Sequence, residues 1–517
     1  MRSRLGLPWL VAVVVLVSLS LLFVSRLRGP APPAPPAYWP TQGWQRATPE
    51  EMGFDSAKVA RMLLAIRDRS IKVHSLLLIR NGYAFVDAAF YPYDGTTVHD
   101  VASVTKSITT TLIGVAADQG RLALDQPMAS FFSDRPIANR EGRKDRITVR
   151  HLTNMSSGLD CTPERDEATL KEMWTTADWV QFVLDRPVQR EPGVQFVYCS
   201  PGSHLLSAIL QQATGVTALE FARRNLFAPL GIREVIWPAD PQGVTRGWGD
   251  IRLLPADMAK LGFLWLKGGR WEDRQIVPRG WVVDSVKPHI STGQGEHYGY
   301  GWWVFTADEQ GEFSSYRADG RGGQYVIVVP SLDLVIATTG GGFDFDEIAP
   351  LLVQTIGDMR RPLPANPTGV AQVAAAVRAV AQAPAPQAVA PLPRMAGIVS
   401  GTTYVFEPNP LMAAMRLEFD DSATAIAAVS LPGRSRPQRW PVGLDGVYRI
   451  STGADGAPLG LRGYWVDPRT FVMEYAGITS NDHYTFRMRF EEHEVVVHAQ
   501  ETAHELAVTF KGRLRRP

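Results

Sequence analysis

Ser103 and Lys106 stand three residues apart in the stretch DVASVTKSIT, at the start of a segment with helical periodicity. Residues three apart lie on the same face of a helix, so the Lys106 amine can reach the Ser103 oxygen. A serine hydroxyl is a weak nucleophile unless a neighbouring base takes its proton. The pair therefore predicts nucleophilic catalysis, provided that Lys106 can lose its own proton near neutral pH. The alternative interpretation is a polar helix start without chemistry.

Two features favour the catalytic interpretation. Lys106 is the only lysine of the chain with a serine three positions earlier, and no G-x-S-x-G motif competes for the nucleophile role.

Tyr198 precedes a helix-like segment and is followed two residues later by Ser200. A phenol placed against a lysine amine can relay a proton to a leaving group. Taken alone, Tyr198 is far more typical of a packing residue at the start of a helix.

A glycine-rich stretch, YRADGRGGQYVIVVP, could complete the site. Its glycines at 320, 322 and 323 lie at the start of a predicted strand, where a substrate can approach the backbone closely. A strand-edge N–H in this stretch can join the Ser103 N–H as an oxyanion hole. The simpler interpretation is a glycine-rich hairpin turn.

The elements around these residues follow from hydrophobic periodicity. HSLLLIRNGYAFVDAAFY predicts two strands around the turn residues Asn81 and Gly82. YGYGWWVF and GGQYVIVVPSLDLVIATTG predict late strands of a sheet, and SHLLSAILQQATG, residues 203–215, belongs to a mostly helical block. Behind Ser103, apolar residues recur at helical spacing and predict one core-facing helix: Val104, Ile108, Leu112 and Val115.

Composition divides the chain into five predicted segments. Residues 1–28 predict an N-terminal membrane anchor, and residues 29–40, GPAPPAPPAYWP, a stiff polyproline spacer. Residues 41–361 carry the patterns of the catalytic domain. Residues 362–394 are rich in proline and alanine and predict a linker with one short helix. Residues 395–517 contain alternating runs such as FVMEYAG and EVVVHAQ, which predict a small antiparallel β domain.

The N-terminal stretch from Leu5 to Val24 is largely apolar. About 20 apolar residues suffice to cross a bilayer, and no A-x-A pattern of a cleaved signal peptide follows. We therefore expect an uncleaved anchor, with a cleaved signal peptide as the alternative. The corresponding location is the inner membrane, with one membrane crossing and the catalytic domain on the periplasmic side.

Bulk composition narrows the possible partners. A net charge of +1 over 517 residues gives no electrostatic reason to expect nucleic acid. Two cysteines and ten dispersed histidines show no zinc-type spacing, so we expect neither a metal nor another cofactor. The expected partner is a small-molecule amide or ester substrate.

The three motifs, in the order S-x-x-K, Y-x-S and glycine-rich strand start, resemble the serine hydrolases of the class C β-lactamase and penicillin-binding-protein type. The resemblance covers roughly Trp44 to Met359. Within that family, MSSGLD, EPGVQFVYCS and GRGGQYVIVVP look closest to the 6-aminohexanoate-dimer hydrolase branch and related esterases. The resemblance implies an α/β (α+β) fold, in which an antiparallel sheet is flanked by helices and a helical subdomain. The small C-terminal all-β domain would follow it.

The resemblance also implies roles for individual residues. Ser103 would be the acylated nucleophile, and Lys106 and Tyr198 would activate it and then protonate the leaving group. The family's Y-x-N is Tyr198-Cys199-Ser200 here. The family's lysine-threonine-glycine strand aligns with Ala318-Asp319-Gly320, which places the oxyanion N–H on Arg321. Sliding the alignment to Arg321-Gly322-Gly323 would place it on Gln324 instead.

Both alignments lack the family's lysine, which helps to hold the carboxylate of a β-lactam. Asp319 would repel that carboxylate unless Arg321 turned inward to neutralise it. These departures predict poor β-lactam hydrolysis and clear activity on short linear esters or amides, with the nylon-dimer type of amide as the leading substrate.

Cys161 and Cys199 are the only cysteines, and in the related fold both segments border the active site. An exported chain with an even pair permits a disulfide, so we expect a bridge that pins the loop beside Tyr198. Two buried thiols are the alternative.

Other functional classes stay open at the level of sequence. The chain could be a D-alanyl-D-alanine carboxypeptidase or β-lactamase-type enzyme, or a membrane-tethered binder or sensor without turnover. The C-terminal domain could also carry the main function, with the hydrolase fold as its scaffold, although we favour a structural cover. The presence of serine, lysine and tyrosine together favours an exported serine hydrolase, because a pure binder does not need Lys106.

Overall fold

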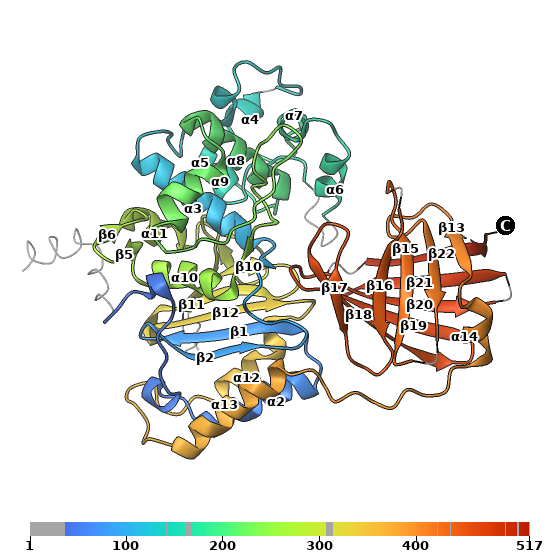
Figure 1. Cartoon of the computed structure of the whole chain (residues 1–517). Helices are drawn as coiled ribbons and strands as arrows, with labels where there is room; N and C mark the ends of the chain where they lie inside the picture. Colours follow the sequence, from blue (N-terminus) through green and yellow to red (C-terminus); the bar gives the residue numbers. More distant parts are fainter. Residues whose placement is uncertain are drawn as a thin grey trace, which may run out of the picture. The chain divides into compact units, whose positions relative to one another are not determined.

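A computed structural model describes residues 37–140, 142–161, 167–306, 314–420, 422–434, 436–491, 493–503 and 506–515. The chain divides into two compact units, Met1–Pro36 and Ala37–Pro517, and all described residues belong to the second. Within it, an eight-stranded antiparallel sheet has the order β2-β1-β12-β11-β10-β9-β8-β7 (Figure 1). Its strands are β1 (Val73–Arg80), β2 (Tyr83–Ala89), β7 (Ile290–Ser291), β8 (His297–Tyr298), β9 (Trp303–Phe305), β10 (Ser315–Gly320), β11 (Gln324–Val329) and β12 (Leu334–Gly340).

Helices cover the sheet and form a helical subdomain. They are α2 (Ser56–Asp68), α3 (Val104–Asp118), α4 (Gly142–Asp145), α5 (Val149–Thr153), α6 (Ala168–Trp174), α7 (Trp179–Asp185), α8 (Ser200–Thr214), α9 (Ala218–Ala222), α10 (Pro255–Leu266), α11 (Arg279–Ser285), α12 (Ala349–Val353) and α13 (Pro367–Ala381). Helix α14 (Arg394–Val399) belongs to the core of the C-terminal domain. Two short strand pairs join β3 (His99–Asp100) to β4 (Arg252–Leu253) and β5 (Arg270–Trp271) to β6 (Arg274–Gln275). The predicted fold class, an antiparallel sheet with flanking helices, is confirmed.

Helices bury both faces of the sheet. Successive side chains of a strand point to opposite faces, so each strand contributes to two cores. On β1, Leu77 and Ile79 belong to the core beneath α3, α8 and α10, whereas Leu76 and Leu78 belong to the core beneath α2 and α13. Figure 1 shows α2, α12 and α13 on one side of the sheet and α10 on the other. The site therefore lies on a sheet that is fixed from both sides.

The predicted hairpin forms as expected. β1 and β2 pair in antiparallel register around Asn81 and Gly82, which have φ angles of 53° and 86°. Positive φ at both turn residues is the geometry of the two-residue hairpin that Asn-Gly favours.

Helix α3 is buried on all sides, which its periodicity alone did not indicate. The predicted core residues Val104, Ile108, Leu112 and Val115 are buried, but so is every other residue from Val104 to Ala116. Strands β10 and β11 and helices α8 and α9 pack against this helix, and Trp281 of α11 packs against Gly114. An amphipathic pattern predicts one apolar face, whereas a helix enclosed by other elements is buried all round.

The segment predicted as a linker contains a long helix. Helix α13 has 15 residues and packs against α2, with Val373, Ala376 and Val380 buried in that core. At the other end of the domain, Trp39 of the predicted spacer packs against Phe263 of α10. Both predicted connecting segments thus contribute side chains to the packed domain.

The C-terminal part is the predicted all-β domain. It is a ten-stranded sheet that closes on itself, because β16 pairs with β18 as well as with β15. Its strands are β13 (Thr403–Phe406), β14 (Ala414–Glu418), β15 (Thr424–Ser430), β16 (Gln438–Gly443), β17 (Arg449–Thr452), β18 (Pro458–Asp467), β19 (Thr470–Gly477), β20 (His483–Phe490), β21 (Glu494–Glu501) and β22 (Leu506–Leu514).

The predicted location in the inner membrane is contradicted. No helix among the described residues is both long and apolar enough to cross a membrane. A crossing takes about 20 residues, whereas the longest described helices, α3, α8 and α13, have 15 residues each. The predicted anchor, residues 1–28, lies outside the described residues. The single-pass topology, the periplasmic placement and the membrane partner are withdrawn.

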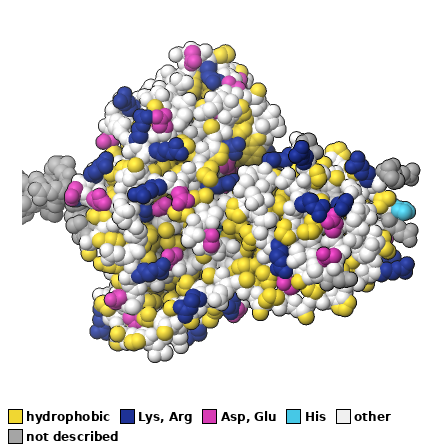
Figure 2. Space-filling model, viewed as in Figure 1, with side chains coloured by type: hydrophobic (Ala, Val, Ile, Leu, Met, Phe, Trp, Pro, Cys, Tyr) yellow, Lys and Arg dark blue, Asp and Glu magenta, His cyan; other side chains and the backbone are white. Residues whose placement is uncertain are grey.

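The surface seen in Figure 2 carries charges of both signs. Lys and Arg side chains lie among Asp and Glu side chains over this face.

Gly114 of α3 offers a test of how tightly the helix behind the site is packed. A Cβ at this position would overlap the indole ring of Trp281 on α11, whereas a Cβ on Gly280 would meet nothing within 4 Å. We expect Gly114→Ala to destabilise the protein by about 1–3 kcal/mol, the usual cost of overpacking. Gly280→Ala, the matched control, should be neutral or slightly stabilising. Thermal unfolding of both variants measures the difference, and equal melting temperatures would show that Trp281 moves aside freely.

Candidate active site

Ser103 is held at the start of α3 by a strained turn. The preceding residue, Ala102, has a φ angle of 45°, a left-handed conformation that a non-glycine residue rarely adopts. The Ala102 N–H donates to Asp100 Oδ1 at 2.8 Å, and the Val101 N–H donates to the Ile251 carbonyl at 2.8 Å. These two hydrogen bonds fix the backbone that positions the Ser103 side chain. Strain of this kind persists only where the surroundings determine it, and it is typical of functional sites.

The Lys106 amine lies against the Ser103 oxygen. Lys106 Nζ donates to Ser103 Oγ at 2.8 Å and to the carbonyl oxygen of Trp248 at 3.0 Å. The lysine side chain is only 2% exposed. Burial lowers the pKa of Lys106 to about 8, against the opposing attraction of Glu167. A substantial fraction of the amine is therefore neutral in mildly alkaline solution and able to accept a proton.

Tyr198 is the third member of the group. The Ser103 side chain interacts with its hydroxyl and partly offsets the rise of its pKa, and its ring centroid lies 4.8 Å from Lys106 Nζ. The ring stacks on Trp303 of β9, with 6.0 Å between centroids. Burial raises the pKa of Tyr198 well above its ordinary value. The phenol thus keeps its proton and can act as a donor toward a leaving group.

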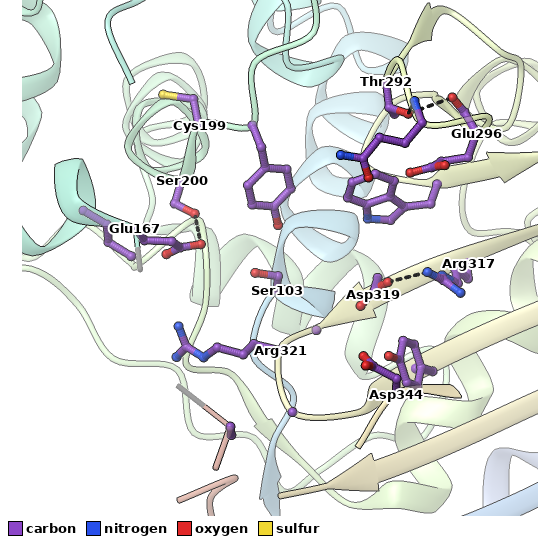
Figure 3. A pocket seen from close by; sticks show the side chains of 18 of the residues that line it. Ser103, Glu167, Cys199, Ser200, Thr292, Glu296, Arg317, Asp319, Arg321 and Asp344 are labelled. Atoms are coloured by element: carbon purple, nitrogen blue, oxygen red, sulfur yellow. Dashed lines mark hydrogen bonds and ion pairs between the residues drawn. The ribbon is translucent and has the colours of Figure 1, made fainter. Parts of the chain in front are cut away.

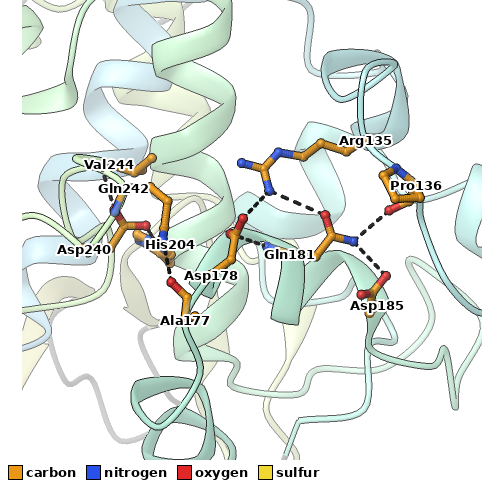
Figure 4. Close-up of polar contacts among 10 residues, drawn as sticks. All are labelled: Arg135, Pro136, Ala177, Asp178, Gln181, Asp185, His204, Asp240, Gln242 and Val244. Atoms are coloured by element: carbon orange, nitrogen blue, oxygen red, sulfur yellow. Dashed lines mark hydrogen bonds and ion pairs between the residues drawn. The ribbon is translucent and has the colours of Figure 1, made fainter.

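A buried pair in the helical subdomain supports the carbonyl that Lys106 contacts. The rings of His204 and Trp248 meet edge to face with 5.1 Å between centroids. His204 Nε2 lies 3.0 Å from Asp240 Oδ2, and Asp240 also accepts from the backbone N–H groups of Gln242 and Val244 (Figure 4). This network fixes α8 and the 240–248 loop relative to each other, and with them the Trp248 carbonyl.

Strand β10 brings the glycine-rich stretch to the serine. β9 pairs with β10 over Ser315–Arg317, so among the described residues, 318–320 have no strand partner on that edge. A Cβ on Gly320 would collide with the Val101 carbonyl. Because Gly320 has no side chain, β10 can pack against the backbone that precedes Ser103. This packing role comes in addition to the close approach of a substrate that the glycine pattern predicts. Gly322 and Gly323, with φ angles of 85° and 97°, form the hairpin turn to β11.

Asp319 does not face the cavity as an unpaired charge. Its Oδ2 lies 3.0 Å from Arg317 Nη2, two residues earlier on the same face of β10. Burial raises the pKa of Asp319 and the Arg317 guanidinium lowers it. Arg321 extends away from Asp319, on the side of Ser103 where Glu167 lies (Figure 3). Arg321 therefore does not turn inward to neutralise Asp319.

Cys161 and Cys199 are joined by a disulfide, with 5.5 Å between their Cα atoms. Cys199 directly precedes α8, so the bridge ties the start of this helix to the 156–161 loop. Their sequence separation of 38 residues implies about 4 kcal/mol of stabilisation in the loop-closure description. Both cysteines line the cavity beside Tyr198.

The cavity in front of Ser103 has a volume of about 750 Å³. Sequence reasoning missed several of its residues, because no motif marks them. Glu167 accepts a hydrogen bond from Ser200 Oγ at 3.0 Å (Figure 3). Among the described residues, no group of three or more His, Cys, Asp or Glu side chains could hold a metal ion. The further polar residues of the lining that were missed include Thr169, Thr292, Gln294, Glu296, Arg317, Asp344, Glu347 and Thr502.

A serine at a helix start, a lysine one turn later and a tyrosine against both define a site of the serine hydrolase class. The sequence model for the family described as Beta-lactamase matches residues 59–349, more than half of the chain. The chain belongs to the β-lactamase family, and with it to the β-lactamase-fold serine hydrolases. The sequence-based family assignment is confirmed.

Individual relatives are distant. The 6-aminohexanoate-dimer hydrolase of Paenarthrobacter ureafaciens is 26% identical over 269 residues, which cover 48% of this chain and 67% of that protein. Protein flp of Staphylococcus aureus is 24% identical over 164 residues, 30% of this chain and 33% of that one. The octameric penicillin-binding protein homologue from Pyrococcus abyssi has a TM-score of 0.48 at 17% identity, covering 88% of this chain and 99% of that chain.

The pKa of Lys106 predicts a pH dependence. Only the neutral amine can accept the serine proton, so kcat/KM for a p-nitrophenyl ester should rise with pH and level off above about 8. Burial also raises the pKa of Asp100 to about 7, which makes Asp100 a second titrating group near the serine. Asp100→Asn removes this second titration and keeps the acceptor for the Ala102 N–H. The rising limb should persist in that variant, and its disappearance would assign the limb to Asp100.

Proposed function

We propose that this protein is an acyl-transferring serine hydrolase that forms an acyl-enzyme on Ser103 and hydrolyses small amides or esters. The observation that carries the proposal is the 2.8 Å contact between Lys106 Nζ and Ser103 Oγ, made by an amine whose pKa is lowered to about 8. A lysine that only stabilised the fold would gain nothing from burial next to a hydroxyl, because burial disfavours its charged form.

In the proposed acylation step, Ser103 Oγ attacks the substrate carbonyl carbon and its proton passes to neutral Lys106. The N–H groups of Ser103 and Arg321 would receive the developing oxyanion, since β10 approaches Ser103 with Gly320 against Val101. Tyr198, which contacts both Ser103 and Lys106, would hand a proton to the leaving amine or alcohol as the bond to carbon breaks. The phenol would then regain a proton from the Lys106 ammonium.

Deacylation would use the same groups in reverse. A water molecule attacks the acyl carbon, and its proton passes through Tyr198 to neutral Lys106. The bond between the carbonyl carbon and Ser103 Oγ breaks, the serine regains its proton, and the free acid leaves. Each group returns to its starting protonation state, so no cofactor is required for the cycle.

The charge of the cavity favours one substrate class. Its described lining includes five acidic side chains, Glu167, Glu296, Asp319, Asp344 and Glu347, against two arginines, Arg317 and Arg321. One acid, Asp319, is already paired with Arg317. The remaining excess of negative charge favours a substrate with an amine and disfavours a carboxylate near the oxyanion hole. A linear amide with a free amino end, as in the substrate named for the Paenarthrobacter relative, fits this lining.

Labelling with a fluorophosphonate tests whether Ser103 is the activated serine. Mass mapping of the labelled protein should place the adduct on the peptide that ends at Lys106. Ser103→Ala should abolish labelling and turnover, and Lys106→Ala and Tyr198→Phe should each reduce turnover by several orders of magnitude. Ser200→Ala, the other serine that lines the cavity, should still be labelled at Ser103. Undiminished turnover by Ser103→Ala would disprove the assignment.

Substrate ranking tests the charge argument. We expect a short-chain p-nitrophenyl ester to be hydrolysed with a higher kcat/KM than a chromogenic cephalosporin, because the cephalosporin carboxylate meets an acidic lining without the family's lysine. The 6-aminohexanoate linear dimer should be cleaved, and its N-acetylated form more slowly, because acetylation removes the positive charge. The opposite order for ester and cephalosporin would refute the ranking.

A further inference from the structure

The C-terminal all-β domain contacts the region around Ser103 through the loop between β19 and β20 and through residues 502–503, which follow β21. The Asp100 N–H, three residues before the nucleophile, donates to the Thr479 carbonyl at 2.9 Å. Arg252 Nη1 donates to Thr479 Oγ1 at 3.4 Å. A Cβ on Gly322, in the β10–β11 turn, would lie 3.0 Å from Ala503 Cβ. Thr502 and Ala503 also line the catalytic cavity. The C-terminal domain therefore contacts the backbone just before Ser103, at Asp100, and the turn between β10 and β11, at Gly322.

Asn481 contacts Arg321, the residue proposed to supply one N–H of the oxyanion hole. Its side-chain Nδ2 donates to the backbone carbonyl of Arg321 at 3.1 Å, across 160 positions of sequence. Gln324 Nε2 donates to the same carbonyl at 3.1 Å and to the Gly340 carbonyl at 2.7 Å. Both amide side chains are buried, Asn481 with 2% exposure and Gln324 with none. One carbonyl is therefore held by a side chain of its own hairpin and by another from the C-terminal domain.

The Arg321 backbone needs such support because of the turn it belongs to. Arg321 is followed by Gly322 and Gly323, both in conformations with positive φ, and glycine restricts its own backbone least of all residues. Within the described part of the chain, the strand edge at 318–320 has no partner toward β9. Rotation about the Arg321 backbone would swing its N–H away from the position an oxyanion takes, whereas two bonds to its carbonyl limit that rotation.

We propose that Asn481 is a positioning residue of the active site: from the C-terminal domain, it fixes the Arg321 backbone so that the Arg321 N–H faces the oxyanion. This inference rests on the proposed acyl-enzyme function. It gives the C-terminal domain a part in catalysis beyond that of a cover. Asn481 acts through Arg321 and has no direct contact with the reacting atoms in this role.

The test compares variants of the full chain at one interface. Asn481→Leu keeps the branching and the number of side-chain heavy atoms and Asn481→Asp keeps the shape, but both lose the N–H donor. Thr479→Val is the matched control, because it removes the hydrogen bond from Arg252 at the same interface without touching the Arg321 carbonyl. Loss of a whole oxyanion donor costs about 10²–10³ in kcat. Misalignment of one donor should therefore lower kcat for a p-nitrophenyl ester by about 10- to 100-fold.

Three readouts separate positioning from mere stability. In both Asn481 variants, KM should change by less than about twofold while kcat falls, because the N–H is aimed at a charge that develops in the transition state. Inhibition by an alkyl boronic acid, which forms a tetrahedral adduct on serine, should weaken by a similar factor. Melting temperatures identify a variant that fails to fold. If Asn481→Leu fails to fold, the near-isosteric Asn481→Asp decides the question.

The outcomes distinguish this inference from the proposed function. Wild-type kcat in Asn481→Asp, together with an inactive Ser103→Ala, would overturn the positioning role and leave the acyl-enzyme proposal standing. An equal fall of kcat in Thr479→Val would also overturn it, because domain docking in general would then be responsible. Turnover that survives in Ser103→Ala would instead remove the proposed function on which the inference rests.

Discussion

Burial of one amine beside one hydroxyl is the constraint on which this structure depends. An ammonium group taken out of water loses hydration free energy, so its pKa falls unless a counter-ion replaces the water. Lys106 has instead a hydroxyl, a backbone carbonyl and an aromatic ring as its neighbours. The acids that influence it, Glu167 and Asp250, offset burial only in part. The result is an amine near its own midpoint at mildly alkaline pH, which is the range in which a general base works best.

Several elements of the fold exclude water from the Lys106 amine and hold it in place. Helix α3 is enclosed on all sides, so neither Ser103 nor Lys106 can move without moving the core. The Trp248 carbonyl is fixed through packing on His204, whose partner Asp240 is bound in turn by the backbone. The disulfide fixes the helix that follows Tyr198. Such support from several separate elements is what holds a catalytic group within a fraction of an ångström.

The cavity departs from a β-lactam site in its charge. In the alignment with the lysine-threonine-glycine strand, Ala318 of β10 stands in place of the lysine. Arg317 of the same strand is already paired with Asp319. A charge that is paired within the protein is not free to bind a ligand's charge at full strength. The cavity of this β-lactamase-fold protein is therefore lined mainly by acidic side chains. The fold alone does not determine which substrate binds.

The sequence by itself determined the features that depend on short separations. The S-x-x-K spacing placed Lys106 on Ser103 because three residues make nearly one helical turn, and Asn81-Gly82 produced its hairpin because both residues tolerate positive φ. The pairing of Arg317 with Asp319 was within reach of the same reasoning, since residues two apart share a face of a strand. The fold class followed from the order of such local patterns.

Only the tertiary structure decided what depends on distant pairs. Asn481 meets the Arg321 carbonyl across 160 positions, and Lys106 meets the Trp248 carbonyl across 142 positions. No periodicity encodes these contacts, because they arise from how whole elements pack. Glu167 likewise reaches the cavity only through the placement of α6 beside α8. Local sequence specifies backbone conformation and which face is apolar, whereas the neighbours of a buried polar group are set by the packing of the whole chain.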